Sequence, residues 1–190
     1  MSDYTELMGE LLELGINANP ALPFTACILD ASGQILITAC NACHISPLYT
    51  AEGLALHCIA SEFDCNHRQS LTLLTTSEPD DLSLMAIYWA RCQGIHINEI
   101  IFGVSRSSLK KIWPEDPSQG LDENLMRYPD DFRKSLTVHG LVLADECYEA
   151  FEEGKAMFDR GEDPVRSMDI DEYWMTGDWL LDDWEEELQE

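Results

Sequence analysis

The sequence predicts an α/β protein in which helices cover both faces of a sheet. Three observations lead to this prediction. Short apolar runs alternate along the chain with longer stretches that carry apolar residues at helical spacing. Two of the runs flank a turn-forming segment, which is typical of a β-hairpin. A further run, residues 98–105, is apolar on both faces, as a central strand should be.

The N-terminal third is expected to form a helix, a hairpin and a second helix. Residues 3–16 place leucines and other apolar side chains at helical spacing, and Pro20 and Pro23 then end the helix. Residues 24–41 form two apolar runs around the turn sequence DASGQ. Residues 51–63 are expected to form the second helix.

The middle of the chain predicts strand, helix and strand. Residues 70–76 form a short apolar strand, and residues 80–94 a helix that ends at Gly94. Residues 98–105 form the next strand. Residues 107–131 contain three prolines, and we expect them to be irregular.

The C-terminal part predicts a short strand at residues 135–142 and a helix at residues 143–161. The chain then becomes acidic, with interspersed tryptophans. We therefore predict a domain over residues 1–160 and an acidic, Trp-containing C-terminal extension over residues 161–190.

The charge of the chain limits the kinds of partner that it can bind. The chain has 190 residues, with 36 acidic against 11 basic side chains and a formal net charge of -25. Such a charge repels a polyphosphate backbone, so we expect no nucleic acid among the partners.

The cysteines and the apolar runs indicate the cellular compartment of the protein. Seven cysteines are scattered, an odd number, and they form no CxxC pair. The N-terminus lacks a basic region, and no apolar run is long enough to span a membrane. We expect a cytoplasmic protein with free thiols and no membrane partner.

Two of the expected helices begin in polar turns, one near Thr50 and the other near Asp80. The N-terminus of a helix collects unpaired N–H groups and the positive end of the helix dipole. If both ends converge on one point, they form a site for a polar ligand.

Four segments together resemble a known family. They read PFTACILDASGQILITACN at residues 23–41, SPLYTAEGLALH at 46–57, TTSEPDDLSLMAIYWAR at 75–91 and IIFGVS at 100–105. In order and spacing they resemble the cytidine-deaminase-like superfamily, nearest the guanine deaminase and tRNA adenosine deaminase branch. The resemblance covers about residues 1–158. It implies a three-layer α/β/α fold with a mixed five-stranded sheet, and a homodimer formed through the helices beside the active site.

The departures from the family pattern fall on its zinc site. The family's zinc histidine aligns with Thr50, and its two zinc cysteines align with Asp80 and Ser83. Zinc prefers nitrogen and sulfur donors, and hydroxyls are poor ligands for it. We therefore expect a degenerate member of the superfamily, with no metal site and no cofactor.

The family's proton-shuttling glutamate aligns with Glu52. Without a metal, the water that this carboxylate would activate keeps a pKa near 15.7. Any remaining catalysis would be that of a hydrolase of the deaminase-like class that uses Glu52. The alternative for Glu52 is an acid in the first turn of a helix, where the dipole favours it.

Three further residues have both a functional and a structural interpretation. Asn41 aligns with the asparagine that contacts the substrate base, or it ends a strand in a turn. Phe24 aligns with a wall of the pocket, or it is a core aromatic. Asp80 contributes to an acidic cluster that could hold a hard cation, or it caps a helix, which we favour.

Neighbouring cysteines and histidines raise the question of a relocated metal site or a thiol nucleophile. The pairs are Cys43–His44, His57–Cys58 and Cys65 with His67. Adjacent side chains on a helix diverge, so His57 cannot serve Cys58 as a base. We expect structural thiols.

The sequence therefore predicts a nucleoside or nucleobase deaminase-like pseudoenzyme with a binding or assembly role and a possible small heterocyclic ligand. One alternative is an enzyme that acts on such a heterocycle by zinc-independent chemistry. A second is an interaction protein that acts through its acidic C-terminal tail.

Overall fold

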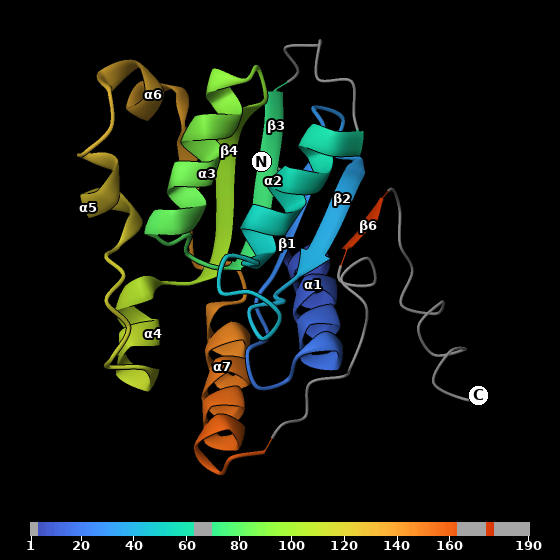
Figure 1. The fold of residues 1–190 in the computed structure, drawn as a ribbon, viewed down its shortest axis with the longest axis vertical. Helices are drawn as coiled ribbons and strands as arrows, with labels where there is room; N and C mark the ends of the chain where they lie inside the picture. Colours follow the sequence, from blue (N-terminus) through green and yellow to red (C-terminus); the bar gives the residue numbers. More distant parts are fainter. Residues whose placement is uncertain (1–3, 63–69, 163–173, 177–190) are drawn as a thin grey trace.

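A computed structural model describes residues 4–62, 70–162 and 174–176. One sheet runs through the molecule (Figure 1). The elements in chain order are α1 (Thr5–Ala18), β1 (Thr25–Leu29), β2 (Ile35–Cys40), α2 (Ala51–Glu62), β3 (Ser70–Ser77), α3 (Asp81–Cys92), β4 (His96–Val104), α4 (Arg106–Ile112), α5 (Leu121–Leu125), α6 (Asp130–Ser135), β5 (Thr137–His139), α7 (Ala144–Asp159) and β6 (Trp174–Thr176).

The strands lie side by side in the order β5-β4-β3-β1-β2-β6. β1 pairs antiparallel with both β2 and β3, whereas β3, β4 and β5 are parallel to one another. The predicted mixed sheet of five strands is therefore present as β1 to β5. A sixth strand, β6, adds to the outer edge of β2.

Helices cover both faces of this sheet. α2 and α3 lie together on one face, and α1 and α7 pack from the other side (Figure 1). Every residue of β1 is buried, as expected for a strand covered on both faces. The largest fully buried side chains come from both layers and the sheet: Met8, Leu11, Leu14, Ile28, Leu29, Ile37, Ile59, Leu73, Leu74, Phe132 and Phe151.

The segment predicted to be irregular, residues 107–131, is about half helical, so that prediction was wrong for the helical part. It contains most of α4, all of α5 and the start of α6. These helices have only seven, five and six residues, too few for a hydrophobic period to be recognised. The prolines lie between the helices, and Pro129 immediately precedes α6, where a proline does not interrupt a helix.

One buried carboxylate fixes the start of two of these short helices. Glu78, which follows β3, accepts a hydrogen bond at Oε2 from the Arg106 backbone N–H (2.6 Å). Its Oε1 accepts one from the backbone N–H of Leu121 (2.5 Å). Glu78 thus holds α4 and α5 against the carboxyl ends of the parallel strands β3 and β4, where open α/β sheets bind ligands.

The C-terminal helix ends where the predicted domain ends. α7 stops at Asp159, and Gly161 follows with a φ of 68°. The division into residues 1–160 and 161–190 stays a prediction. Within the extension, β6 pairs with β2, so part of it docks on this chain. The remaining tryptophans, Trp179 and Trp184, lie outside the described residues.

Of the helices in the described part of the chain, none has the length and apolar character that crossing a membrane requires.

Candidate functional site

The start of α2 and the start of α3 meet at a small cavity of about 140 Å³ at one end of the sheet. We call it the inner cavity. It is lined by Leu22, Phe24, Asn41, Cys43, Thr50, Ala51, Glu52, Asp80 and Arg106. The structure therefore brings together five of the six residues that the sequence analysis singled out, and the sixth, Ser83, is hydrogen-bonded to Glu52.

Both helix N-termini are capped by the residues that align with zinc ligands. The Thr50 Oγ1 accepts a hydrogen bond from the Gly53 backbone N–H (3.1 Å). The Asp80 Oδ1 accepts one from the Ser83 backbone N–H (2.7 Å). The structural interpretation of Asp80 as a helix cap is thus confirmed, and the two helix ends converge as expected.

Glu52 is buried at this convergence, with 3% of its surface exposed. Its Oε1 accepts a hydrogen bond from the Thr75 hydroxyl (2.7 Å) and its Oε2 one from the Ser83 hydroxyl (3.2 Å). Burial raises the pKa of the Glu52 carboxyl, and the nearby Asp80 charge raises it further, against the lowering effect of the Thr75 hydrogen bond. Glu52 therefore favours its protonated form more than an exposed glutamate does.

The three residues at the ligand positions do not fit a zinc ion. The Thr50 hydroxyl caps α2, and the Ser83 hydroxyl is bonded to Glu52. Of the Asp80 oxygens only Oδ2 is free of the helix cap, and it lies 4.0 Å from the Arg106 Nη2. One carboxylate oxygen beside a guanidinium, with two committed hydroxyls, is a poor donor set. Among the described residues, no group of three or more His, Cys, Asp or Glu side chains could hold a metal ion.

Asn41 lies at the end of β2 with its side chain mostly committed to the backbone. Its Oδ1 accepts a hydrogen bond from the Cys43 N–H (3.2 Å), and its Nδ2 donates to the Leu22 carbonyl (3.5 Å). This is the turn-forming role that the sequence left open. The second N–H of the amide is the group with which Asn41, which lines the cavity, could contact a ligand.

Phe24 forms a wall of the inner cavity and is held by other aromatic rings. Its ring centroid lies 4.5 Å from that of Phe151 and 6.4 Å from that of Trp113. The ring is half-buried against the core and also lines the cavity, and its role toward a ligand stays a prediction.

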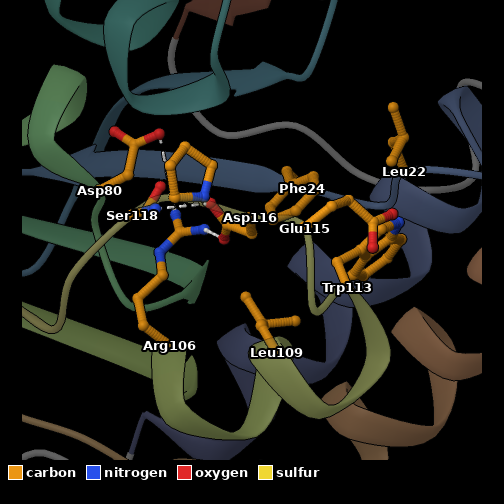
Figure 2. A pocket seen from close by; sticks show the side chains of 10 residues that line it. Leu22, Phe24, Asp80, Arg106, Leu109, Trp113, Glu115, Asp116 and Ser118 are labelled. Atoms are coloured by element: carbon orange, nitrogen blue, oxygen red, sulfur yellow. Dashed lines mark hydrogen bonds and ion pairs between the residues drawn. The ribbon is translucent and has the colours of Figure 1, made fainter.

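A larger cavity of about 370 Å³ adjoins the inner one, and we call it the outer cavity (Figure 2). It shares four residues with the inner cavity: Leu22, Phe24, Asp80 and Arg106. The rest of its wall comes from α4 and the segment after it: Leu109, Trp113, Glu115, Asp116, Pro117 and Ser118.

Arg106, which the sequence analysis did not single out, lies on the boundary of both cavities. Its side chain is 8% exposed, and its Nε donates to the Glu78 carbonyl (2.7 Å). Figure 2 shows the guanidinium pointing between Asp80 and Asp116, whose Oδ2 lies 3.5 Å from Nη1. A basic residue directly after the strand sequence IIFGVS, in a chain with few basic residues, was the available signal.

The thiols do not form a nucleophilic site in the described residues. Cys43 lines the inner cavity, but burial, followed by the charges of Glu52 and Asp80, raises the pKa of its thiol to about 11. A thiol with that pKa is a poor nucleophile. His57 is exposed and Cys58 is buried, so the two diverge as predicted. Cys65 and His67 lie outside the described residues.

Comparison with known proteins gives structural neighbours only. No protein-family model and no curated protein matches the sequence. Guanine deaminase from Nitrosomonas europaea superposes with a TM-score of 0.58 at 21% identity, over 78% of this chain and 82% of that one. A mutant protein in complex with 8-azaguanine gives 0.62 at 22% identity, over the same two shares.

A structure of a tRNA:A34 deaminase, which carries out A-to-I editing at the wobble position of transfer RNA, gives a TM-score of 0.55 at 18% identity. The match covers 76% of this chain and 99% of that one. These likenesses show that the chain has the cytidine-deaminase-like fold, as predicted.

Proposed function

We propose that this chain uses a cytidine-deaminase-like fold to bind a small planar heterocycle in the joined cavities, without zinc chemistry. One observation carries the proposal. A cavity is present where the fold would bind its ligand, and the residues expected at the zinc-ligand positions are Thr50, Asp80 and Ser83. Phe24 offers a supported aromatic face, and polar groups of two helix ends converge beside it. At the same place, Thr50 and Ser83 serve internal hydrogen bonds.

The structural neighbours support this class of ligand. Two of them are complexes with 8-azaguanine and with 2,6-diaminopurine, both flat heterocycles. The net charge of -25 argues against transfer RNA as the ligand of this chain, because a polyphosphate would be repelled. We therefore infer a free small molecule.

A thermal-shift screen of purines, pyrimidines and pterins tests the proposal. A ligand present at 100 times its dissociation constant stabilises the folded state by about 2.7 kcal/mol, so binding raises the melting temperature. The matched variant is Phe24→Leu, which keeps an apolar side chain in the core and removes the ring face, and it should weaken the shift. If no compound stabilises the protein at millimolar concentration, the proposal is wrong.

Metal content provides a second test. We expect purified protein to hold much less than one zinc per chain, because hydroxyls and one carboxylate oxygen are weak donors. The triple variant Thr50→His, Asp80→Cys, Ser83→Cys should bind zinc before it gains any deaminase activity. One tightly held zinc in the unaltered protein, by elemental analysis after chelator treatment, would contradict the proposal.

A zinc-independent enzyme is the second candidate, and Glu52 favours it. A buried carboxyl with a raised pKa at a cavity wall has the properties of a general acid. Under this candidate, Glu52→Gln abolishes turnover of a heterocycle that the screen identifies and leaves its binding intact. Under the binding proposal, neither protein turns it over.

We also propose that the protein is a cytoplasmic homodimer. The exposed apolar side chains of α3 support the dimer, and free thiols are typical of a reducing compartment. Within the described residues the free cysteines include Cys27, Cys40, Cys43, Cys92 and Cys147.

A further inference from the structure

We propose that Arg106 and Asp80 together recognise a cyclic amide edge of the ligand. The ring N–H donates to the Asp80 Oδ2, and the neighbouring carbonyl oxygen accepts from the Arg106 guanidinium. The inference rests on the proposed binding function and names the chemical class of ligand for that site.

The donor half of the pair is fixed in place. The Arg106 backbone N–H is bonded to the Glu78 carboxylate (2.6 Å), and the Nε to the Glu78 carbonyl (2.7 Å). Nη1 lies 3.5 Å from the Asp116 Oδ2, which the Ser118 backbone N–H holds through Oδ1 (2.9 Å). These bonds hold the guanidinium in place, with Nη2 4.0 Å from the Asp80 Oδ2, and Arg106 lines both cavities.

The acceptor half is equally defined. Asp80 Oδ1 is occupied by the cap of α3, whereas Oδ2 lies 4.0 Å from the Arg106 Nη2. Asp80 lines both cavities, and its side chain is 23% exposed. Asp80 is the N-cap of a twelve-residue helix, and its Oδ2 takes no part in the cap. Oδ2 is therefore the Asp80 acceptor that a ligand in the cavities could use.

The two halves lie close enough together for the edge of one ligand to contact both. Nη2 and Asp80 Oδ2 are 4.0 Å apart, which is beyond the range of a hydrogen bond. A cyclic amide presents an N–H donor next to a C=O acceptor, so it can satisfy both groups at once. Each of these bonds is charge-assisted, and a pair of them fixes the orientation of a planar ring.

The surroundings fit a flat, neutral ring. Phe24 lines both cavities, so its ring can pack on the ligand while the ligand edge meets the Arg106–Asp80 pair. The outer cavity is lined by the acids Asp80, Glu115 and Asp116 and by the base Arg106, an excess of negative charge that disfavours an anionic ligand. Leu109 and Trp113 leave apolar room beyond the ring for a substituent.

The experiment compares isoquinolone, which has one N–H beside one C=O, with N-methylisoquinolone, which lacks the donor. Titration calorimetry or ligand-observed NMR measures both affinities. One hydrogen bond to a charged group corresponds to roughly a tenfold change in affinity or more, so isoquinolone should bind at least about 10-fold more tightly. Equal affinities would overturn the inference without any variant protein.

Asp80→Asn provides the variant test, with Asp81→Asn as its matched control. Asparagine is also a good helix cap, so Asp80→Asn keeps α3 and replaces a charged acceptor with an amide. Asp81 is exposed and lies outside both cavity walls, and its substitution removes the same charge one residue away. We expect Asp80→Asn to lower the affinity for isoquinolone at least about 10-fold. The variant should also bind isoquinolone and N-methylisoquinolone with similar affinity.

The two proposals fail in different ways. If Asp80→Asn and Asp81→Asn bind isoquinolone alike, the Arg106–Asp80 inference is wrong, and the binding function stands on the other compounds of the screen. If no heterocycle of any kind binds to the unaltered protein, both proposals fall together.

Discussion

At the scale of single residues, the three side chains expected at zinc-ligand positions all make hydrogen bonds within the protein. The side-chain oxygens of Thr50 and Asp80 accept hydrogen bonds from backbone N–H groups at the starts of α2 and α3. The Ser83 hydroxyl donates a hydrogen bond to Glu52. A hydroxyl or carboxylate oxygen used in this way contributes to the folded state directly, with no bound ion. In the structure these three side chains cap two helices and form one buried hydrogen-bond network around Glu52.

The buried carboxyl of Glu52 predicts a pH-dependent gain in stability for Glu52→Gln. Its folded pKa is raised above the ordinary value of 4.5 by burial and by Asp80. Between these two values the folded state binds more protons than the unfolded state, so stability falls as pH rises through this window. Glutamine carries no such penalty and can still bond to Thr75 and Ser83.

We expect the melting temperature of Glu52→Gln minus that of the unaltered protein to be smallest near pH 4.5 and largest near pH 8. Thermal melts across that range measure it. The control is Glu152→Gln on the exposed face of α7, which should give a small difference without this rise. If the melting temperatures of Glu52→Gln and of the unaltered protein differ by the same amount at every pH, the pKa of Glu52 is not raised in the folded state.

The sequence could predict those site residues that lie in segments whose order and spacing resemble a known family. Phe24, Asn41, Thr50, Glu52 and Asp80 all line the inner cavity. Arg106 was not predicted, because its position depends on a tertiary contact. The start of α4 is bonded to Glu78, which follows β3. Hydrogen bonds to Glu78, twenty-eight residues earlier, set that position, and spacing along the sequence does not encode them.

At the scale of elements, the helices that were predicted correctly are those long enough to show a repeating pattern of apolar residues. α1, α2, α3 and α7 each have twelve or more residues, and all four were expected. α4, α5 and α6 were not, because their register depends on tertiary contacts such as the two hydrogen bonds accepted by Glu78.

Two helical glycines should respond to alanine in opposite directions. A Cβ on Gly9 of α1 would meet only the Leu143 Cδ1 at 3.7 Å, an ordinary contact. A Cβ on Gly154 of α7 would lie 2.6 Å from the Pro20 carbonyl oxygen and 2.7 Å from that of Ala21. Alanine gains roughly 0.5–1 kcal/mol over glycine within a helix, which only the first site can realise.

We therefore expect Gly9→Ala to raise the melting temperature by about 1–4 °C and Gly154→Ala to lower it by more than that. Differential scanning calorimetry of the pair measures both. Since Pro20 and Ala21 lead into Leu22 on the cavity wall, Gly154→Ala should also weaken ligand binding. A stabilising Gly154→Ala would mean that α7 packs less closely than the structure shows.

At the scale of the whole molecule, α3 presents an apolar stripe that predicts self-association. Leu82, Met85 and Trp89 are 41%, 44% and 61% exposed, and their spacing places them on one side of the helix. A net charge of -25 opposes association, so salt should strengthen it.

Light scattering after size exclusion should find a dimer at 0.5 M salt, and Trp89→Lys should make the protein monomeric. Phe158→Lys is the control, because Phe158 is 56% exposed on α7, away from α3. Should Trp89→Lys and the unaltered protein have the same mass, the stripe serves another partner or none.

The last prediction concerns β6, which closes one edge of the sheet. β2 pairs with β6 from Ile37 to Ala39, so β6 occupies backbone groups that would otherwise be open. An open edge strand is a template for pairing with another chain. Truncation after Asp169 removes β6 and should lower the melting temperature and promote aggregation.

Truncation after Thr176 is the matched control, because it removes the acidic, tryptophan-containing remainder and keeps β6. We expect this shorter loss to leave the melting temperature and the monodispersity nearly unchanged. Thermal melts and light scattering of the two truncated proteins separate the contribution of the strand from that of the residues after it. If both melt like the full chain, β6 does not stabilise the sheet, and the tail acts on an external partner. If both melt lower, residues 177–190 contribute stability of their own.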